Sequence, residues 1–118
     1  MLSYTLKELE VLEDMPIIVL IKNEEGKYLW GNKFWRELAG IDSAEDVVGK
    51  TDYDMIWADH AYELIRNDKQ VLDSGEPVTT PEHVKLVGIG EVTGDICKFP
   101  ATIDGKRCVM GIALLLDI

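Results

Sequence analysis

Residues 28–40 read YLWGNKFWRELAG, and this stretch decides which fold the chain can adopt. Its first three residues have strand composition, but the Gly-Asn step after them leads into a helical pattern that ends at Gly40. A simple hairpin would return as a second strand. Here Phe34 and Trp35 lie on a short helix instead, so we expect this helix to cover an interior space beside a sheet.

The sequence on both sides of this stretch indicates an α+β chain. Residues 17–21 are a β-branched run typical of a buried strand, and they form a hairpin with the strand at 27–31. Helical spacing predicts the longest helix over 58–73. Three strands are predicted after it, over 78–87, 91–103 (with Gly94 at a bulge) and 106–116. This order predicts a five-stranded antiparallel sheet with short helices and one long helix on one face, plus an N-terminal amphipathic helix.

Alternation on the last two strands predicts which side chains share a face. A hairpin turn at Asp104-Gly105 places Cys97 opposite Ile112 and Ala101 opposite Cys108. The two thiols are then roughly 13 Å apart along the strands, too far for a disulfide. We expect the more apolar face, which carries Cys97, Phe99, Met110 and Ile112, to point toward the long helix. The opposite face, which carries Lys98, Thr102, Arg107, Val109, Gly111 and Ala113, is expected to support the N-terminal helix.

The first fifteen residues are predicted to form an N-terminal helix for packing and dimerisation, ahead of a domain that covers residues 16–118. Thr5 and Glu8 form a capping box, which predicts a helix over 5–13 that Pro16 ends. Apolar residues fall on two faces of this helix, so one face can contact the sheet and the other a second copy of the chain. The residues predicted for packing and dimerisation are Tyr4, Leu6, Leu9, Val11 and Leu12.

Composition excludes several classes of protein. The 118 residues fit one domain, and 47% hydrophobic content is typical of a globular chain. A net charge of −10 disfavours binding to nucleic acid or to an anionic membrane surface. No apolar run reaches the length of a membrane span, and no cationic leader is present. Two unpaired cysteines indicate a reduced, cytoplasmic protein.

Several pieces of the sequence together resemble a PAS domain over about residues 14–118. They are NEEGKYLWGN (23–32), FWRELAG (34–40), VVGKT (47–51), the helix end at 68–75, KFP (98–100) and the final DGKRCVMGIALLLDI (104–118). The resemblance is sharpest to domains of bacterial signalling proteins. It implies a sensor or interaction module joined to a kinase, a cyclase or a transcription regulator. Asp117 matches the position where such domains continue into a helical linker, so we expect the chain to be an excised piece of a longer protein.

This fold implies a cavity between the sheet and the short helices, with apolar walls and few polar groups. Asp68 lies within the apolar stripe of the long helix, where it either bonds to nearby backbone or contacts a ligand. The apolar candidates are either plain core or cavity wall. The residues predicted to bind a ligand are Trp30, Phe34, Met55, Trp57, His60, Ile65, Asp68, Phe99, Met110 and Ile112.

Cofactor signals are weak. His60 falls on the helix that carries the axial histidine in haem-binding PAS sensors, but Glu91 stands where those sensors place an arginine, so His60 is either structural or a haem ligand. Residues 51–58 contain no cysteine, which disfavours a flavin adduct. The cluster Asp52, Asp54 and Asp59 is explained by helix capping rather than by a metal.

No nucleophile and base can be paired in the sequence, so we expect no catalysis by this domain. We expect a sensory module that dimerises and binds a small molecule in an internal cavity. The alternatives are a homodimerisation module without ligand and, less favoured, a haem-binding gas or redox sensor. The identity of the ligand stays open.

Overall fold

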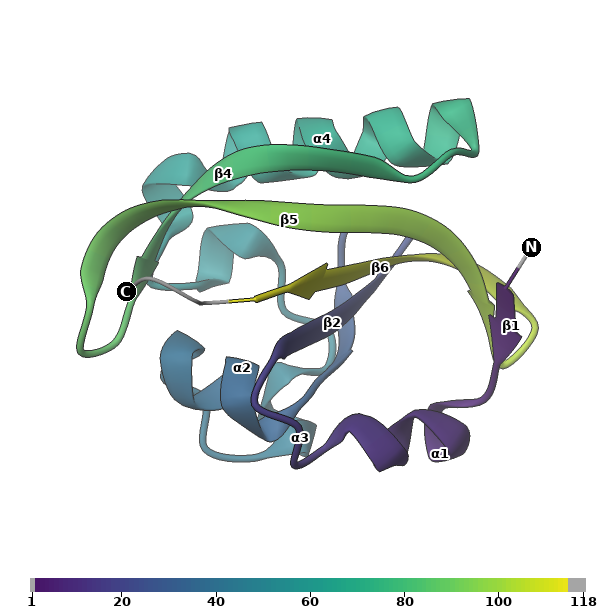
Figure 1. Ribbon diagram of the computed structural model, residues 1–118, viewed down its shortest axis with the longest axis horizontal. Helices are drawn as coiled ribbons and strands as arrows, with labels where there is room; N and C mark the ends of the chain where they lie inside the picture. The colour runs from purple at the N-terminus through teal and green to yellow at the C-terminus, as the bar shows by residue number, and fades with distance from the viewer. Residues whose placement is uncertain (1, 115–118) are drawn as a thin grey trace.

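The computed structural model describes residues 2–114 and confirms the α+β class (Figure 1). A strongly curved sheet has α4 on one side and α1 on the other. The strands are β1 (Leu2–Tyr4), β2 (Ile18–Asn23), β3 (Tyr28–Gly31), β4 (Val78–Leu86), β5 (Gly90–Ile103) and β6 (Lys106–Ala113). The helices are α1 (Leu6–Leu9), η1 (Glu10–Leu12), α2 (Lys33–Ala39), α3 (Ala44–Val47), η2 (Asp52–Asp54), η3 (Ala58–His60) and α4 (Ala61–Ser74).

The sheet contains the five predicted antiparallel strands and a sixth that the sequence did not indicate. Its order is β1-β5-β6-β2-β3, and β4 also pairs with β5. Residues 2–4, which precede the helix predicted over 5–13, form the short strand β1, which runs parallel to residues 101–103 of β5. The bulge predicted at Gly94 is absent, since Gly94 pairs in regular register with Glu82. The end of the last predicted strand, residues 115–116, lies outside the described residues.

The hairpin between β5 and β6 has the predicted register. Cys97 pairs with Ile112 and Ala101 with Cys108, and both thiols are free. Asp104 and Gly105 form the turn, both with positive φ (50° and 78°). This conformation is the one that two-residue hairpin turns require, and Asp and Gly adopt it more readily than most residues.

The assignment of the two sheet faces was wrong. Phe99, Met110 and Ile112 pack with Leu9 in a cluster beneath α1, on the side away from α4. Cys97, which pairs with Ile112, shares that face. The opposite face, expected to support the N-terminal helix, lines the interior beneath the remaining helices: it carries Leu20, Lys98 and Ala113. Both faces are buried, so apolar alternation alone could not show which helices cover which face.

A bulge in β3 separates two aromatic side chains that would otherwise share a face. Ile21 pairs with Trp30 while the next residue, Lys22, pairs with Tyr28, so Leu29 is an extra residue in β3. Tyr28 therefore points into the interior with Trp35, whereas Trp30 packs in the cluster beneath α1.

The N-terminal segment lies on the outer face of the sheet. The Thr5–Glu8 capping box is present, but the helix is shorter than predicted: α1 ends at Leu9 and continues as the 3-10 turn η1. Leu9 is 4% exposed and packs on the sheet, and Tyr4, Leu6 and Leu12 are half-buried around it, which fits the packing role. Val11, at 79% exposed, points away from the sheet.

Over residues 2–114, the structure contains no helix of the length and apolar character that crossing a membrane requires.

Candidate ligand cavity and its buried charge network

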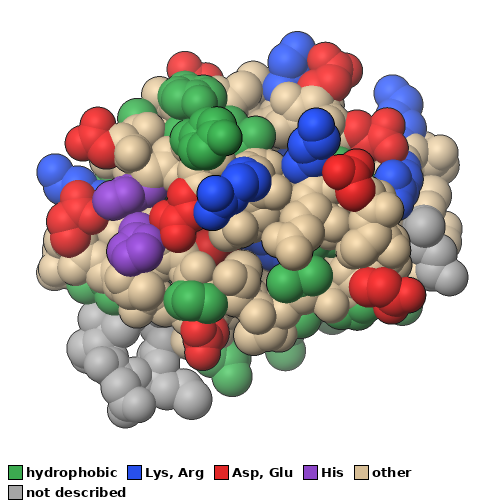
Figure 2. Space-filling model, turned by 90° about the horizontal axis from the view of Figure 1, so that it is seen from above, with side chains coloured by type: hydrophobic (Ala, Val, Ile, Leu, Met, Phe, Trp, Pro, Cys, Tyr) green, Lys and Arg blue, Asp and Glu red, His purple; other side chains and the backbone are tan. Residues whose placement is uncertain are grey.

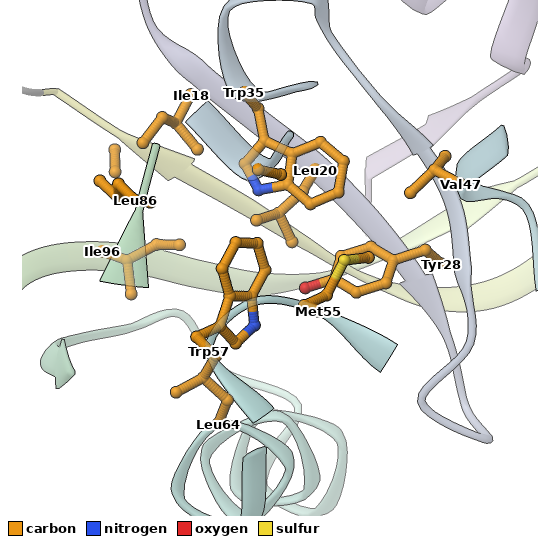
Figure 3. Packing of buried hydrophobic residues seen from close by; sticks show 12 residues of the cluster. Ile18, Leu20, Tyr28, Trp35, Val47, Met55, Trp57, Leu64, Leu86 and Ile96 are labelled. Atoms are coloured by element: carbon orange, nitrogen blue, oxygen red, sulfur yellow. The ribbon is translucent and has the colours of Figure 1, made fainter. Parts of the chain in front are cut away.

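A cavity of about 330 Å³ lies between the concave face of the sheet and the helices, within the size range of small-molecule sites. Trp35 on α2 and Trp57 before η3 point toward each other across the interior, with their ring centroids 6.1 Å apart (Figure 3). Tyr28 on β3 lies 5.0 Å from Trp35. The lining is mainly apolar and includes Ile18, Leu20, Leu64, Val84, Leu86, Val92, Ile96 and Ala113.

Residues 28–40 place Trp35 in this wall. Asn32 caps α2 by accepting a hydrogen bond from the backbone N–H of Trp35, and Gly40 ends the helix with a left-handed conformation (φ 75°). Gly31 is required because a Cβ at this position would overlap the Trp35 ring. The Gly-Asn step therefore lets the aromatic ring lie directly on the end of β3.

Five charged side chains form a continuous buried network at one end of the cavity. The Nζ of Lys22 lies 2.5 Å from Asp52 Oδ2 and 2.7 Å from Asp68 Oδ2. The Nζ of Lys98 lies 2.7 Å from Asp68 Oδ1 and 2.6 Å from Glu82 Oε2. Asp68 thus bridges the two lysines, and the network joins β2, η2, α4, β4 and β5.

Neutral donors complete the network. Both the Tyr28 hydroxyl and the Trp57 indole N–H donate to Asp52 Oδ1, at 2.5 and 2.9 Å, and in Figure 3 the two groups converge. The side-chain amide of Asn67 donates to Glu82 Oε2 at 3.1 Å. Buried ionic groups are tolerated only when their hydrogen-bonding capacity is met in this way.

The network shifts the pKa values of its members in opposite directions. Burial alone would lower the pKa of Lys22, but the charges of Asp68 and Asp52 outweigh burial and raise it. Burial would raise the pKa of Asp52, yet the charge and hydrogen bond of Lys22, with those of Tyr28 and Trp57, hold it below 3.8. Burial and then the Asp52 charge raise the pKa of Tyr28 well above its ordinary value. Lys22 and Asp52 are therefore an ion pair at neutral pH.

Trp57 is the one predicted ligand residue that lines the cavity within the part of the chain that the structure describes. Asp68 is buried at the end of the cavity but is not part of its lining. Both of its oxygens bind lysines rather than nearby backbone. Met55 is core beside Trp57, and Ile65 is half-buried on α4. For these residues contact with a ligand stays a prediction.

Four predicted ligand residues lie on the wrong side of the sheet. Trp30, Phe99, Met110 and Ile112 belong to the cluster beneath α1. Trp30 is there because of the bulge at Leu29. The other three are there because their face of the sheet is covered by the N-terminal segment and not by the long helix.

Phe34 and His60 are also outside the cavity wall. Phe34 packs at the edge of the interior core and lines a shallow surface hollow with residues 13–16. His60 is half-buried, with its Nε2 2.8 Å from Glu91 Oε2. Its ring is 5.8 Å from that of His83, which binds Glu63, and the two histidines lie side by side on the surface (purple in Figure 2). This placement does not direct His60 toward the cavity.

Lys22, Tyr28, Glu82 and Lys98 line the cavity and were missed by sequence reasoning. Lys22 ends a β-branched run, and Lys98 alternates with buried residues of β5, so each had a periodicity signal for burial. Their charge made an exposed position the simpler interpretation, because lysine is rarely buried without a partner. Their partners are 16 to 46 residues away in sequence. Asp68, which lies within the apolar stripe of α4, was the network member that sequence reasoning identified as a candidate site residue.

Among residues 2–114 there is no group of three or more His, Cys, Asp or Glu side chains arranged to hold a metal ion. Asp52 is a network member, and Asp54 completes the capping box of η2 with Thr51, as the capping interpretation predicted.

Comparison with known proteins finds one curated relative with a matching segment. The chain is 32% identical to a diguanylate cyclase of Vibrio cholerae over 81 residues, which are 69% of this chain and 25% of the relative. The chain thus matches only about a quarter of that protein's length.

Solved structures show the same fold at lower identity. The VqmA dimer of Vibrio cholerae, described as a LuxR-type receptor, superposes with a TM-score of 0.80 at 22% identity, over 96% of this chain and 53% of that one. VqmA has also been solved bound to DPO. The PAS domain of the quorum-sensing receptor RpfR of Cronobacter turicensis, in complex with BDSF, superposes with a TM-score of 0.67 at 12% identity, over 87% of this chain and 97% of that one.

The family model described as the PAS fold matches residues 12–118, nearly the whole chain. The curved antiparallel sheet, the short helices over its concave face and the cavity between them agree with this match. The chain belongs to the PAS-fold family.

Proposed function

We propose that this chain is the sensory domain of a bacterial multidomain regulator and binds a small molecule in its internal cavity. The observation that carries the proposal is the cavity of about 330 Å³, with three aromatic rings and buried charged groups in its wall. A domain that only dimerises has no need of such a space, since interiors otherwise pack with few voids. VqmA and RpfR, which share the fold, have been solved with small molecules.

Helix α2 gives the cavity a physical link to the N-terminal segment. Trp35 lines the cavity, and the next residue, Arg36, makes a bidentate ion pair with Glu13 at 2.8 and 2.9 Å. The Asn32 side chain donates to the backbone carbonyls of Leu12 and Ile17. A ligand that moves Trp35 would therefore shift α1 and η1 on the outer face, by no more than its differential affinity for the two states.

The second part of the proposal is a homodimer formed through the N-terminal segment and the outer sheet face. Val11 supports it, because this large apolar side chain is exposed next to Leu9, which holds the segment on the sheet. In the full regulator the signal would pass from this dimer to an output domain such as a histidine kinase, a diguanylate cyclase or a transcription regulator. We further propose a cytoplasmic location and no nucleic-acid or membrane contact by this domain.

Native mass spectrometry of the freshly purified chain tests ligand binding. We expect an added mass that is lost on denaturation. Gly94→Leu is the blocking variant: Gly94 lines the cavity opposite Glu82, and nothing lies within 4 Å of its added Cβ. The control is Lys85→Leu, an exposed position on β4 that is absent from the cavity lining. Loss of the added mass in the control as well, or its retention in Gly94→Leu, would contradict binding in this cavity.

Sedimentation tests the dimer. Val11→Asp should shift the chain toward monomer without loss of folding, since the side chain contacts solvent in the single chain. A wild-type chain that stays monomeric at high concentration would refute the dimer.

The haem alternative is less supported, because the Nε2 of His60 faces Glu91 rather than the cavity. A Soret band in the freshly purified protein would revive it.

A further inference from the structure

The buried network is not electrically balanced. Two lysines, Lys22 and Lys98, face three carboxylates, Asp52, Asp68 and Glu82, which leaves a formal charge of −1 in a region where all five side chains are at most 7% exposed. An uncompensated charge away from water is costly unless another group stabilises it. The imbalance favours a positive or hydrogen-donating group in the adjacent cavity and disfavours a second anion.

Glu82 presents this imbalance to the cavity. It is 5% exposed and lines the cavity wall. Its Oε2 binds both Lys98 and Asn67, whereas no group within residues 2–114 donates a hydrogen bond to Oε1. Among the described residues, Arg36 Nε is the one side-chain polar atom that is fully buried and has no partner. Because Oε1 also has no partner, it is not fully buried and keeps some accessible surface. Glu82 thus offers a free acceptor.

The positive groups beside Glu82 are already in use. The Nζ of Lys98 contacts Asp68, Glu82 and the carbonyl of Leu64, so all three of its protons have acceptors. The Nζ of Lys22 binds two carboxylates and lies 5.0 Å from the centre of the Tyr28 ring. A ligand carboxylate would have to displace these contacts before it could pair with either lysine.

The aromatic wall favours the same kind of ligand. Tyr28, Trp35 and Trp57 line the cavity near the network. Aromatic faces attract organic cations and also stack on flat neutral rings. The excess negative charge of the network and the aromatic wall therefore favour ligands of the same chemical class.

We propose that the cavity selects a small nitrogen compound, an amine, an amidine or a protonated N-heterocycle, whose N–H donates to Glu82 Oε1, and that it rejects carboxylates. This inference rests on the proposed function, because it names the chemical class of ligand for the same cavity.

Three isosteric probes test the selection on the intact chain: benzamidine (cationic), benzamide (neutral) and benzoate (anionic). Each is titrated while the backbone amide signals of β4 and β5 are followed by NMR. Since a hydrogen bond to a charged group changes affinity by about tenfold or more, we expect benzamidine to bind at least about tenfold more tightly than benzoate, with benzamide between them.

Glu82→Gln is the matched variant. It removes the excess charge while keeping the side-chain shape, so we expect the preference for benzamidine over benzoate to fall to about threefold or less. The control is Glu76→Gln, an exposed residue outside the cavity lining, which should keep the wild-type preference.

The outcomes separate the two proposals. Benzoate binding as tightly as benzamidine to the wild type would overturn the selection and leave the cavity as a ligand site. An unchanged preference in folded Glu82→Gln would also overturn the inference. If none of the three probes perturbs amides around the cavity, both the inference and the ligand-binding function are refuted. Even if Glu82→Gln does not fold, the wild-type titrations still decide whether the cavity prefers benzamidine to benzoate.

Discussion

Replacing Lys22 by methionine tests whether the buried network holds η2 and α4 against the sheet. Lys22 is 1% exposed and has two carboxylate partners, Asp52 and Asp68. Methionine fills similar space, so packing is largely retained, but Asp52 loses its cation and the formal charge of the network becomes −2. Breaking a buried pair by removing one partner costs about 3–5 kcal/mol of unfolding free energy.

That cost is a large share of the total, since a domain of this kind is stable by about 5–15 kcal/mol. The loss of unfolding free energy should be near the lower end of about 3–5 kcal/mol. The reason is that Asp52 keeps the hydrogen bonds of Tyr28 and Trp57, and Asp68 keeps its ion pair with Lys98. Urea unfolding at neutral pH, followed by far-UV circular dichroism, measures the loss directly.

The double variant Lys22→Met/Asp52→Asn separates the ion pair from simple loss of a residue. Removing the second charge relieves the unpaired carboxylate, so the double variant should be more stable than the sum of the single costs predicts, by at least about 1 kcal/mol. Additive costs, or a loss below about 1 kcal/mol in Lys22→Met, would refute the reasoning that these groups stabilise one another.

The same variants predict a pH dependence. In the wild type the pKa of Asp52 is lowered, so its contribution to stability is present above its ordinary value of 3.8 and is lost as pH falls through the folded-state value. In Lys22→Met burial becomes the dominant influence and should raise the pKa of Asp52 instead. The stability gap between wild type and Lys22→Met should therefore narrow as pH falls below about 4, and a gap that widens would contradict this assignment.

Three further predictions concern packing beside the cavity and on the outer face of the sheet. Gly31→Ala should destabilise the chain by about 1–3 kcal/mol in urea unfolding, since its methyl would overlap the Trp35 ring; a neutral result would refute the close approach. Leu9→Asp should destabilise the chain by several kcal/mol, because it buries a carboxylate against the outer sheet face, whereas Val11→Asp should unfold at nearly the wild-type urea concentration. Cys108 is fully buried and burial raises its pKa, so iodoacetamide should label half-buried Cys97 faster in the native state; equal rates would contradict the placement of Cys108.

Much of the fold could be predicted from local patterns. The register of the last hairpin follows from the turn at Asp104-Gly105, and the bounds of α2 follow from Asn32 and Gly40. The strand β1 could not be predicted, because three residues that pair in parallel with a distant strand leave no local pattern.

The cavity was predicted as a space but not by its residues. Strand alternation showed that Phe99 and Met110 share a face, yet it could not show that the N-terminal segment covers that face. The polar wall was missed because Lys22 and Lys98 are buried by virtue of ion pairs to residues far away in sequence. A site built from such pairs becomes visible only when the fold brings the partners together.

The additional residue at Leu29 has a consequence for variants of this cavity that differ in strand length. Deleting Leu29 would leave Tyr28 opposite Lys22 and Trp30 opposite Ile21 as neighbours in a regular strand, and neighbouring side chains point to opposite faces, so the phenol would stay beside Asp52 and the indole on the outer face. Loss of one residue from β3 at this point should therefore leave unchanged the ring that a bound molecule meets.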